Sequence, residues 1–232
     1  MPDSLLYNSP DALYLHIPYC LRKCPYCDFY SVVQEPPEAF LQALICELDA
    51  WAEIMPTTPL RTVYFGGGTP TRLKTSQLIA LLSHIQDRFG LQKGAEITLE
   101  MNPESQQDLA ALRGAGFNRL SLGLQTTDNA KLRKLGRLHA YEGFLKTYKV
   151  ARAAGFENIS IDLMVALPDQ TLDDVALDLE RILALEPEHI SCYSLILEEG
   201  TPFGERLEQG VAPLPSDEVE REMVHQVTET LQ

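Results

Sequence analysis

The chain has few basic residues for its acidic content. Its 232 residues include 19 lysines and arginines against 33 aspartates and glutamates, so the formal net charge is −14 at pH 7. Such a surface repels phosphate backbones, which excludes nucleic acid as a general partner. No apolar run is long enough for a transmembrane segment, and the N-terminus lacks the basic start of a signal peptide.

Cysteine is also scarce, and its count is odd. Three of the five cysteines crowd into one short segment, whereas Cys46 and Cys192 stand alone. This pattern does not suit a disulfide framework and favours a reducing compartment, so we expect a cytoplasmic protein. We expect Cys46 and Cys192 to be buried as small apolar residues in a helix and a strand.

The crowded segment reads Cys20-Leu-Arg-Lys-Cys24-Pro-Tyr-Cys27 and follows an apolar run, Leu13–Ile17. Three thiolates can hold three irons of a cubane cluster and leave the fourth iron open, whereas an electron carrier is ligated by four cysteines. An open metal position can bind a substrate or cofactor. The alternative is a structural zinc site with His16 as fourth ligand, although the second spaced pair of such sites is missing.

Apolar runs alternate with amphipathic stretches along the chain, which predicts an α/β fold with a parallel sheet. The segment Arg113–Leu124 is matched 39 residues later by Arg152–Leu163, and each copy predicts a helix end, a glycine cap and a buried strand. Thr171 and Asp174 predict a capped helix start, and 215–232 predicts one helix begun by Ser216. The predicted strands are Leu13–Ile17, Thr62–Phe65, Glu96–Glu100, Arg119–Gln125, Asn158–Met164 and His189–Leu195.

The residues around the cysteines resemble the radical S-adenosylmethionine (SAM) superfamily. Tyr14-Leu-His-Ile-Pro-Tyr-Cys20 and Cys24-Pro-Tyr-Cys27-Asp-Phe29 are most similar to the oxygen-independent coproporphyrinogen III oxidase group, which includes the heme chaperone HemW family. The resemblance implies an incomplete (β/α)6 barrel over 11–205, after an N-terminal extension at 1–10. Residues 206–232 would start a C-terminal region that is truncated relative to the family.

Polar and glycine motifs follow the expected strands, where parallel sheets place their sites. Gly66-Gly-Gly-Thr69-Pro70 permits close backbone approach to a ligand, or forms only a tight turn before a helix. It is not a phosphate-binding Walker A loop, because no Gly-Lys-Ser/Thr follows. Glu100 ends a buried strand, where a carboxylate needs a partner. The resemblance implies that Gly67, Gly68 and Thr69 bind the SAM amino group and that Glu100 contacts SAM.

Five further side chains complete the cofactor site implied by the resemblance. Gln125 would contact SAM, and it shares a strand face with Gly123 by the period of two. Arg137, in Leu135-Gly-Arg-Leu-His139, would pair with the SAM carboxylate, whereas without the motif it would be a solvent-exposed arginine. Asp162 would bind the ribose. Tyr14 and Phe29 would lie beside the cofactor, although either aromatic also suits a core position.

Two departures from the family pattern bear on function. The coproporphyrinogen dehydrogenases carry an extra cysteine where this chain has Phe29, which favours the chaperone branch. The family segment Tyr-Gly-Leu-Pro-Gly-Gln-Thr is replaced by Val165-Ala-Leu-Pro-Asp-Gln-Thr171. The resemblance therefore implies a [4Fe-4S] and SAM-binding heme chaperone, with heme as a possible further ligand. Its partners would be heme or a porphyrinogen, a heme-accepting client and an electron donor.

Two other functions stay open. One is an oxygen-independent coproporphyrinogen III oxidase that decarboxylates propionates to vinyl groups. The other is a zinc-binding barrel without catalysis. Any of the five histidines could ligate heme iron, but a single histidine is more often structural, so none is assigned.

Overall fold

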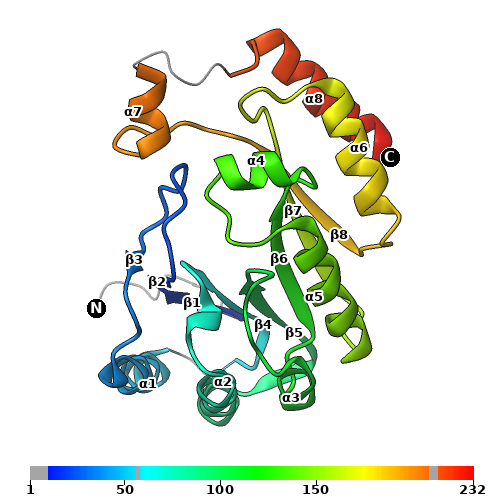
Figure 1. Cartoon of the computed structure of the whole chain (residues 1–232). Coiled ribbons are helices and arrows are strands. Elements are labelled where there is room, and N and C mark those ends of the chain that lie inside the picture. The colour runs from blue at the N-terminus through cyan, green and yellow to red at the C-terminus, as the bar shows by residue number, and fades with distance from the viewer. Residues whose placement is uncertain (1–9, 56–57, 209–213) are drawn as a thin grey trace, which may run out of the picture.

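Six parallel strands form one twisted sheet in the computed structural model, which describes residues 10–55, 58–208 and 214–232 (Figure 1). The strands follow in chain order across the sheet, apart from a small separate pair, so every connection crosses over by helices. All six expected strands are confirmed. Their bounds are β1 Ala12–Ile17, β4 Leu60–Gly67, β5 Leu91–Met101, β6 Arg119–Gln125, β7 Ile159–Val165 and β8 His189–Ser194.

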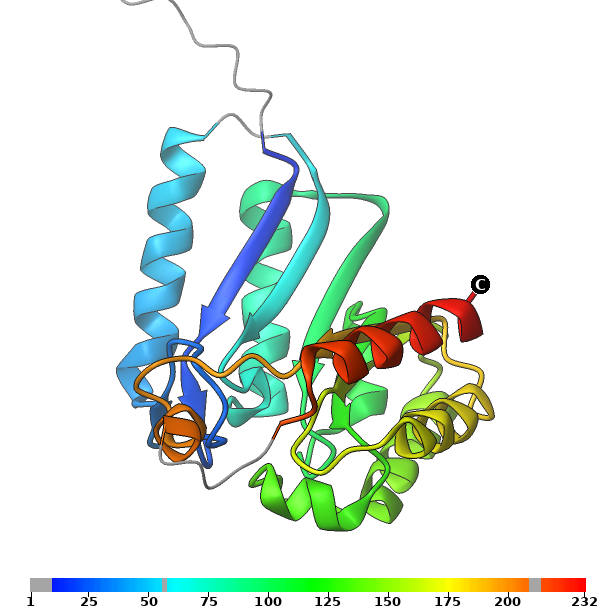
Figure 2. The ribbon, with the colours of Figure 1, turned by 90° about the horizontal axis from the view of Figure 1, so that it is seen from above.

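Helices cover one side of the sheet, as Figure 2 shows from above. The connection between β6 and β7 contains two helices, α4 and α5. The helices are α1 Glu38–Ile54, α2 Thr75–Phe89, α3 Leu109–Ala115, α4 Asn129–Lys134, α5 Tyr141–Ala153, α6 Leu172–Leu183, α7 Pro202–Glu208 and α8 Asp217–Thr230, with a 3-10 turn η1 at Pro70–Arg72.

The core lies between the sheet and these helices, and apolar burial there is the main stabilising term. The two matched segments behave alike. Gly116 and Gly155 end α3 and α5 with positive φ, and the following Phe117 and Phe156 are buried at the starts of β6 and β7. The predicted cap of α6 is confirmed, since Thr171 and Asp174 bond reciprocally to each other's backbone N–H.

The C-terminal helix belongs to the same core. Helix α8 packs on α6, β7 and β8, and its Met223 and Val227 are buried. Ser216 caps it as predicted. The expected domain boundary at residue 205 falls inside α7. None of the helices in the described ranges is long and apolar enough to cross a membrane.

The isolated cysteines depart from expectation. Cys46 is in a helix as predicted, but it is exposed on α1, so the expectation that it is buried is wrong. Cys192, on β8, is half-buried against the core. The crowded cysteines follow β1 in a loop that a short pair, β2 Tyr19–Cys20 and β3 Val32–Val33, closes at its base.

Candidate functional site

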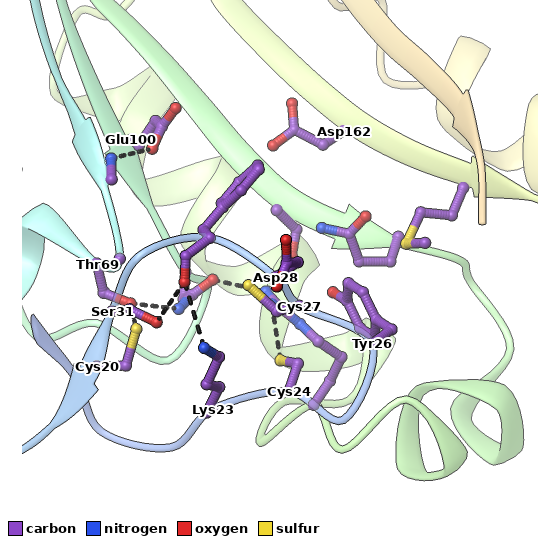
Figure 3. A pocket seen from close by; sticks show the side chains of 18 of the residues that line it. Cys20, Lys23, Cys24, Tyr26, Cys27, Asp28, Ser31, Thr69, Glu100 and Asp162 are labelled. Atoms are coloured by element: carbon purple, nitrogen blue, oxygen red, sulfur yellow. Dashed lines mark hydrogen bonds between the residues drawn. The ribbon is translucent and has the colours of Figure 1, made fainter. Parts of the chain in front are cut away.

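A cavity of about 440 Å³ opens at the carboxyl ends of the strands (Figure 3). Its wall is built from the cysteine loop and from the ends of β4, β5, β6, β7 and β8. This volume is within the range of small-molecule and cofactor sites. The position is the one expected for the site of a parallel α/β sheet.

All three cysteines of the loop line this cavity. The Thr69 hydroxyl donates to Cys20 Sγ at 3.6 Å, and Arg137 Nη1 donates to Cys24 Sγ at 3.7 Å. Burial raises the pKa of the Cys27 thiol, and the neighbouring thiols of Cys24 and Cys20 act in the same direction. Metal binding would reverse this effect, because thiolates are the ligating form.

His16 is not arranged as a zinc ligand. Its Nδ1 is 3.1 Å from the Tyr14 hydroxyl, and its Nε2 is 2.9 Å from the carbonyl oxygen of Tyr30. Within the described ranges, no group of three or more His, Cys, Asp or Glu side chains is arranged to hold a single metal ion. In a cubane each thiolate binds a different iron, so a cluster does not require the three thiols to converge on one ion.

The glycine turn after β4 lies directly against the cysteine loop. Gly67 has a φ of 115°, and a Cβ there would be 2.9 Å from the His16 ring. A Cβ on Gly68 would be 2.9 Å from Cys20 Sγ. Only glycine fits both constraints at Gly67, so the turn has a steric reason beyond chain reversal. Gly67 and Gly68 both line the cavity.

Glu100 closes β5 with both carboxylate oxygens occupied. Oε1 accepts from the Tyr64 hydroxyl at 2.6 Å, and Oε2 accepts from the Gly67 N–H at 3.1 Å. Burial raises the pKa of Glu100, and these two hydrogen bonds oppose that rise. The carboxylate therefore fixes the glycine turn and also faces the cavity.

Gln125 ends β6 with a φ of 79°, and the register with β7 shifts between Gly123 and Gln125. Both residues line the cavity, so the predicted shared face is confirmed despite this shift in register. The Gln125 Oε1 accepts from the Tyr193 hydroxyl at 2.9 Å, and its Nε2 donates no hydrogen bond to any of the described residues. Just beyond the strand, Thr127 N–H donates to buried Asp178 at 2.7 Å and anchors the bend.

Arg137 lies behind the cysteine loop rather than in solvent. Its Nη2 donates to Asn102 Oδ1 at 2.6 Å and to the Gly123 carbonyl at 2.7 Å. A Cβ on Gly123 would be 3.0 Å from this nitrogen, so a larger residue would crowd the contact. The buried Nε has no hydrogen-bond partner among the described residues. A buried guanidinium is costly without counter-charge, which an anionic ligand or thiolates would supply.

Asp162 interrupts the apolar β7 and faces the cavity. The Ser121 hydroxyl donates to its Oδ1 at 3.0 Å. Burial raises the pKa of Asp162 to about 7; the Ser121 bond opposes the rise and the charge of Glu100 adds to it. Near neutral pH the carboxyl therefore exchanges between acceptor-only and donor forms.

The loop after β7 holds two non-glycine residues in the left-handed region. Ala166 has a φ of 58° and Asp169 a φ of 59°. These are the two positions at which the resembled family has glycine. Ala166 is buried, whereas Asp169 is exposed and pairs with Lys134 at 2.8 Å. The chain keeps the glycine-type backbone despite both substitutions.

The two aromatic candidates, Phe29 and Tyr14, lie in different surroundings. Phe29 lines the cavity and is 68% exposed, so its ring is free to cover a ligand. Tyr14 is absent from the cavity lining. Its ring stacks on Tyr64, its neighbour on β4, with centroids 5.9 Å apart. Its expected contact with SAM is not supported by this placement.

Three lining residues were not singled out from the sequence. Asn102 joins the glycine turn to Arg137, since it donates to Thr69 Oγ1 at 3.3 Å. Tyr193 and Tyr26 contribute aromatic wall. The available signal was the same for Asn102 and Tyr193: a polar side chain at the end of a buried strand.

The family model of the Radical SAM superfamily matches residues 14–182. The chain belongs to the radical SAM superfamily. Membership implies a [4Fe-4S] cluster and SAM as cofactors. The cysteines, the glycine turn and the buried Arg137 fit such a pair chemically, because they offer three thiol ligands, open backbone and a positive charge next to one cavity.

Relatives within the superfamily include heme chaperones. The chain is 40% identical to the heme chaperone HemW of Lactococcus lactis over 230 residues, which cover 97% of this chain and 60% of that protein. It is 37% identical to HemW of Escherichia coli over 202 residues, covering 85% of this chain and 53% of that protein. The chain thus spans between about half and three fifths of these relatives.

Solved structures agree with the fold. Coproporphyrinogen III oxidase (HemN) from Escherichia coli superimposes with a TM-score of 0.85 at 28% identity, covering 96% of this chain and 52% of that chain. Methylornithine synthase (PylB) gives a TM-score of 0.64 at 16% identity, covering 97% and 64%, and supports the fold alone. The chain is therefore a HemW- and HemN-like member with an incomplete radical SAM barrel.

Proposed function

We propose that Cys20, Cys24 and Cys27 hold a [4Fe-4S] cluster with one iron open to the cavity. All three thiols line the cavity, and two of their sulfurs accept hydrogen bonds from Thr69 and Arg137. Hydrogen bonds to sulfur are among the features that set a cluster's potential. When bound, the cluster and SAM supply one-electron chemistry, for which an electron donor is a required partner.

SAM occupies the rest of the cavity in this proposal. The glycine turn offers backbone to the amino group, and Arg137 offers its charge to the carboxylate. Gln125 keeps free N–H donors, and Asp162 faces the cavity as a partner for ribose hydroxyls. Phe29 lies at the exposed side, where a ring can stack on adenine. The proposed contacts are Gly67, Gly68, Thr69, Glu100, Gln125, Arg137, Asp162 and Phe29.

The function that this site supports best is that of a HemW-type heme chaperone, which binds heme and transfers it to a client in the cytoplasm. The observation that carries it is the similarity to HemW over 97% of this chain, together with Phe29 in place of the extra cysteine of the dehydrogenases. The chain spans only part of these relatives, so heme binding by this chain is itself part of the proposal.

A second candidate is an oxygen-independent coproporphyrinogen III oxidase. The structural likeness to HemN, at a TM-score of 0.85, favours it. Phe29 opposes it. The two functions share the cluster and SAM and differ in what happens to the tetrapyrrole.

Anaerobic incubation separates them. The reconstituted protein is mixed with SAM and either heme or coproporphyrinogen III. Heme that stays bound through gel filtration, with no vinyl product from the porphyrinogen, supports the chaperone. Formation of vinyl groups selects the oxidase. A colourless protein that retains zinc and no iron would overturn both.

A further inference from the structure

Hydrogen bonds at the start of α7 fix the backbone around Phe203. The Thr201 hydroxyl donates to the Glu198 carbonyl at 2.7 Å and accepts from Gly204 N–H at 3.1 Å. A Cβ on Gly204 would be 2.4 Å from that same carbonyl, so this turn requires glycine. The residue fixed between them is Phe203, to which neither the cavity nor the family motifs assign a role.

Phe203 reaches across to the cysteine loop. Its N–H donates to the Pro25 carbonyl at 3.0 Å. Its side chain is 4% exposed and joins a small apolar cluster that is separate from the main core. Tyr26 of the cysteine loop packs on this cluster, with ring centroids 6.4 Å apart from Phe203. The other members are Leu135, Met164, Leu167 and Leu195.

The opposite side of the same loop segment is also held. A Cβ on Gly136 would be 2.8 Å from Pro25 Cδ, so the turn after α4 lies against the proline. The next residue, Arg137, donates to Cys24 Sγ. The segment Cys24–Tyr26 therefore packs between the end of α4 and the start of α7. Both views of the molecule place α7 beside the loop (Figures 1 and 2).

We propose that Phe203 is a positioning residue for the iron–sulfur cluster. Phe203 holds Pro25 and Tyr26, which lie between the proposed ligands Cys24 and Cys27. The backbone of both cysteines is therefore already in its binding conformation in the metal-free protein. Ordering a loop on binding costs conformational entropy, and a loop that is already held in place avoids that cost. This inference rests on the proposed cluster at the three cysteines, and it adds α7 to the cluster-binding unit.

The test uses Phe203→Ala, Phe203→Leu and, as a control, Val227→Ala. Val227 is buried in α8, away from the cysteine loop, so its truncation lowers stability without touching Phe203. Three measurements are made. Hydrogen exchange in the metal-free protein reports on the amides of 20–31. After anaerobic reconstitution, the rate of iron loss to a chelator and the electron paramagnetic resonance spectrum of the reduced cluster report on the site.

We expect Phe203→Ala to exchange faster in the loop, to lose iron several-fold faster and to broaden the spectrum. Phe203→Leu should restore most of each property, and Val227→Ala should match wild type in all three. Equal loop exchange and iron loss in Phe203→Ala and Val227→Ala would overturn the inference while leaving the cluster intact. A wild-type protein that binds no iron would overturn the proposed function and this inference with it. If Phe203→Ala does not fold, Tyr26→Leu, which removes the ring that packs near Phe203, takes its place, and wild-type loop exchange and iron loss in that variant would overturn the inference.

Discussion

Arg137 Nη1 lies 3.7 Å from Cys24 Sγ. This contact joins the proposed carboxylate partner of SAM to a proposed ligand of the cluster. The same guanidinium bonds to the Gly123 carbonyl at 2.7 Å, so it also fixes the end of β6. One part-buried side chain thus contacts both the cysteine loop and the end of β6.

Cys24→Ser should abolish cluster loading while leaving the fold largely intact. A serine hydroxyl is a poor iron ligand, and two thiolates do not hold a cubane. Iron and sulfide are measured per chain after anaerobic reconstitution. Cys46→Ser, at an exposed position on α1, is the matched control and should load fully. Full iron retention by Cys24→Ser would refute the assignment.

Arg137→Ala should weaken SAM binding without removing the cluster. The substitution deletes the positive charge and leaves the Gly123 carbonyl and Asn102 Oδ1 without this donor. Stability should fall by about 1–3 kcal/mol for the unpaired groups. Calorimetry with SAM on the reconstituted protein measures the affinity. Arg133→Ala, at an exposed position on α4, should bind SAM as wild type does. Equal affinity in both variants would contradict the role of Arg137.

Asp162→Asn should remove a pH-dependent loss of stability. Burial raises the pKa of Asp162 from 3.8 to about 7, so the folded state holds a proton that the unfolded state releases. The contribution of Asp162 to stability is therefore greatest below about pH 4, falls by up to ~1.4 kcal/mol per pH unit toward pH 7, and then levels. Urea unfolding of the metal-free proteins from pH 4 to 8 gives the difference. Parallel curves for both proteins would show that Asp162 is not buried in this way.

Ala166→Gly should stabilise the protein by up to about 1 kcal/mol. The Ala166 backbone has a φ of 58°, which disfavours any residue with a Cβ, and relief of that strain exceeds the entropy that glycine adds to the unfolded chain. Ala110→Gly, at an exposed position in α3, should instead lose about 0.5–1 kcal/mol. Thermal unfolding of both variants tests the sign. Destabilisation of similar size at both sites would contradict the strain at Ala166.

The sequence predicted the sheet well because its strands are continuous apolar runs bounded by glycine caps. The bounds of β6, Arg119–Gln125, agree at both ends. It did not predict the bulge before Gln125, because a register shift depends on the neighbouring strand. Tyr14 shows the same limit. Its ring direction follows from pairing opposite Tyr64, which periodicity within one strand does not reveal.

Long-range contacts around the cysteines were also beyond the sequence. The spacing of Cys20, Cys24 and Cys27 predicted a metal site from local pattern alone, and all three thiols do line one cavity. That Gly136 packs on Pro25, and that Phe203 bonds to its carbonyl, depends on segments more than 100 residues away. Such contacts arise from tertiary packing and leave no periodic signal.

The sheet has two free margins, because β1 and β8 lie at its opposite ends and do not pair with each other in the described chain. In a closed barrel of strands, a ligand could reach the interior only through the ends of the barrel. Among the described residues no strand joins β8 to β1, so the heme exchange proposed above would not require any strand pairing to break.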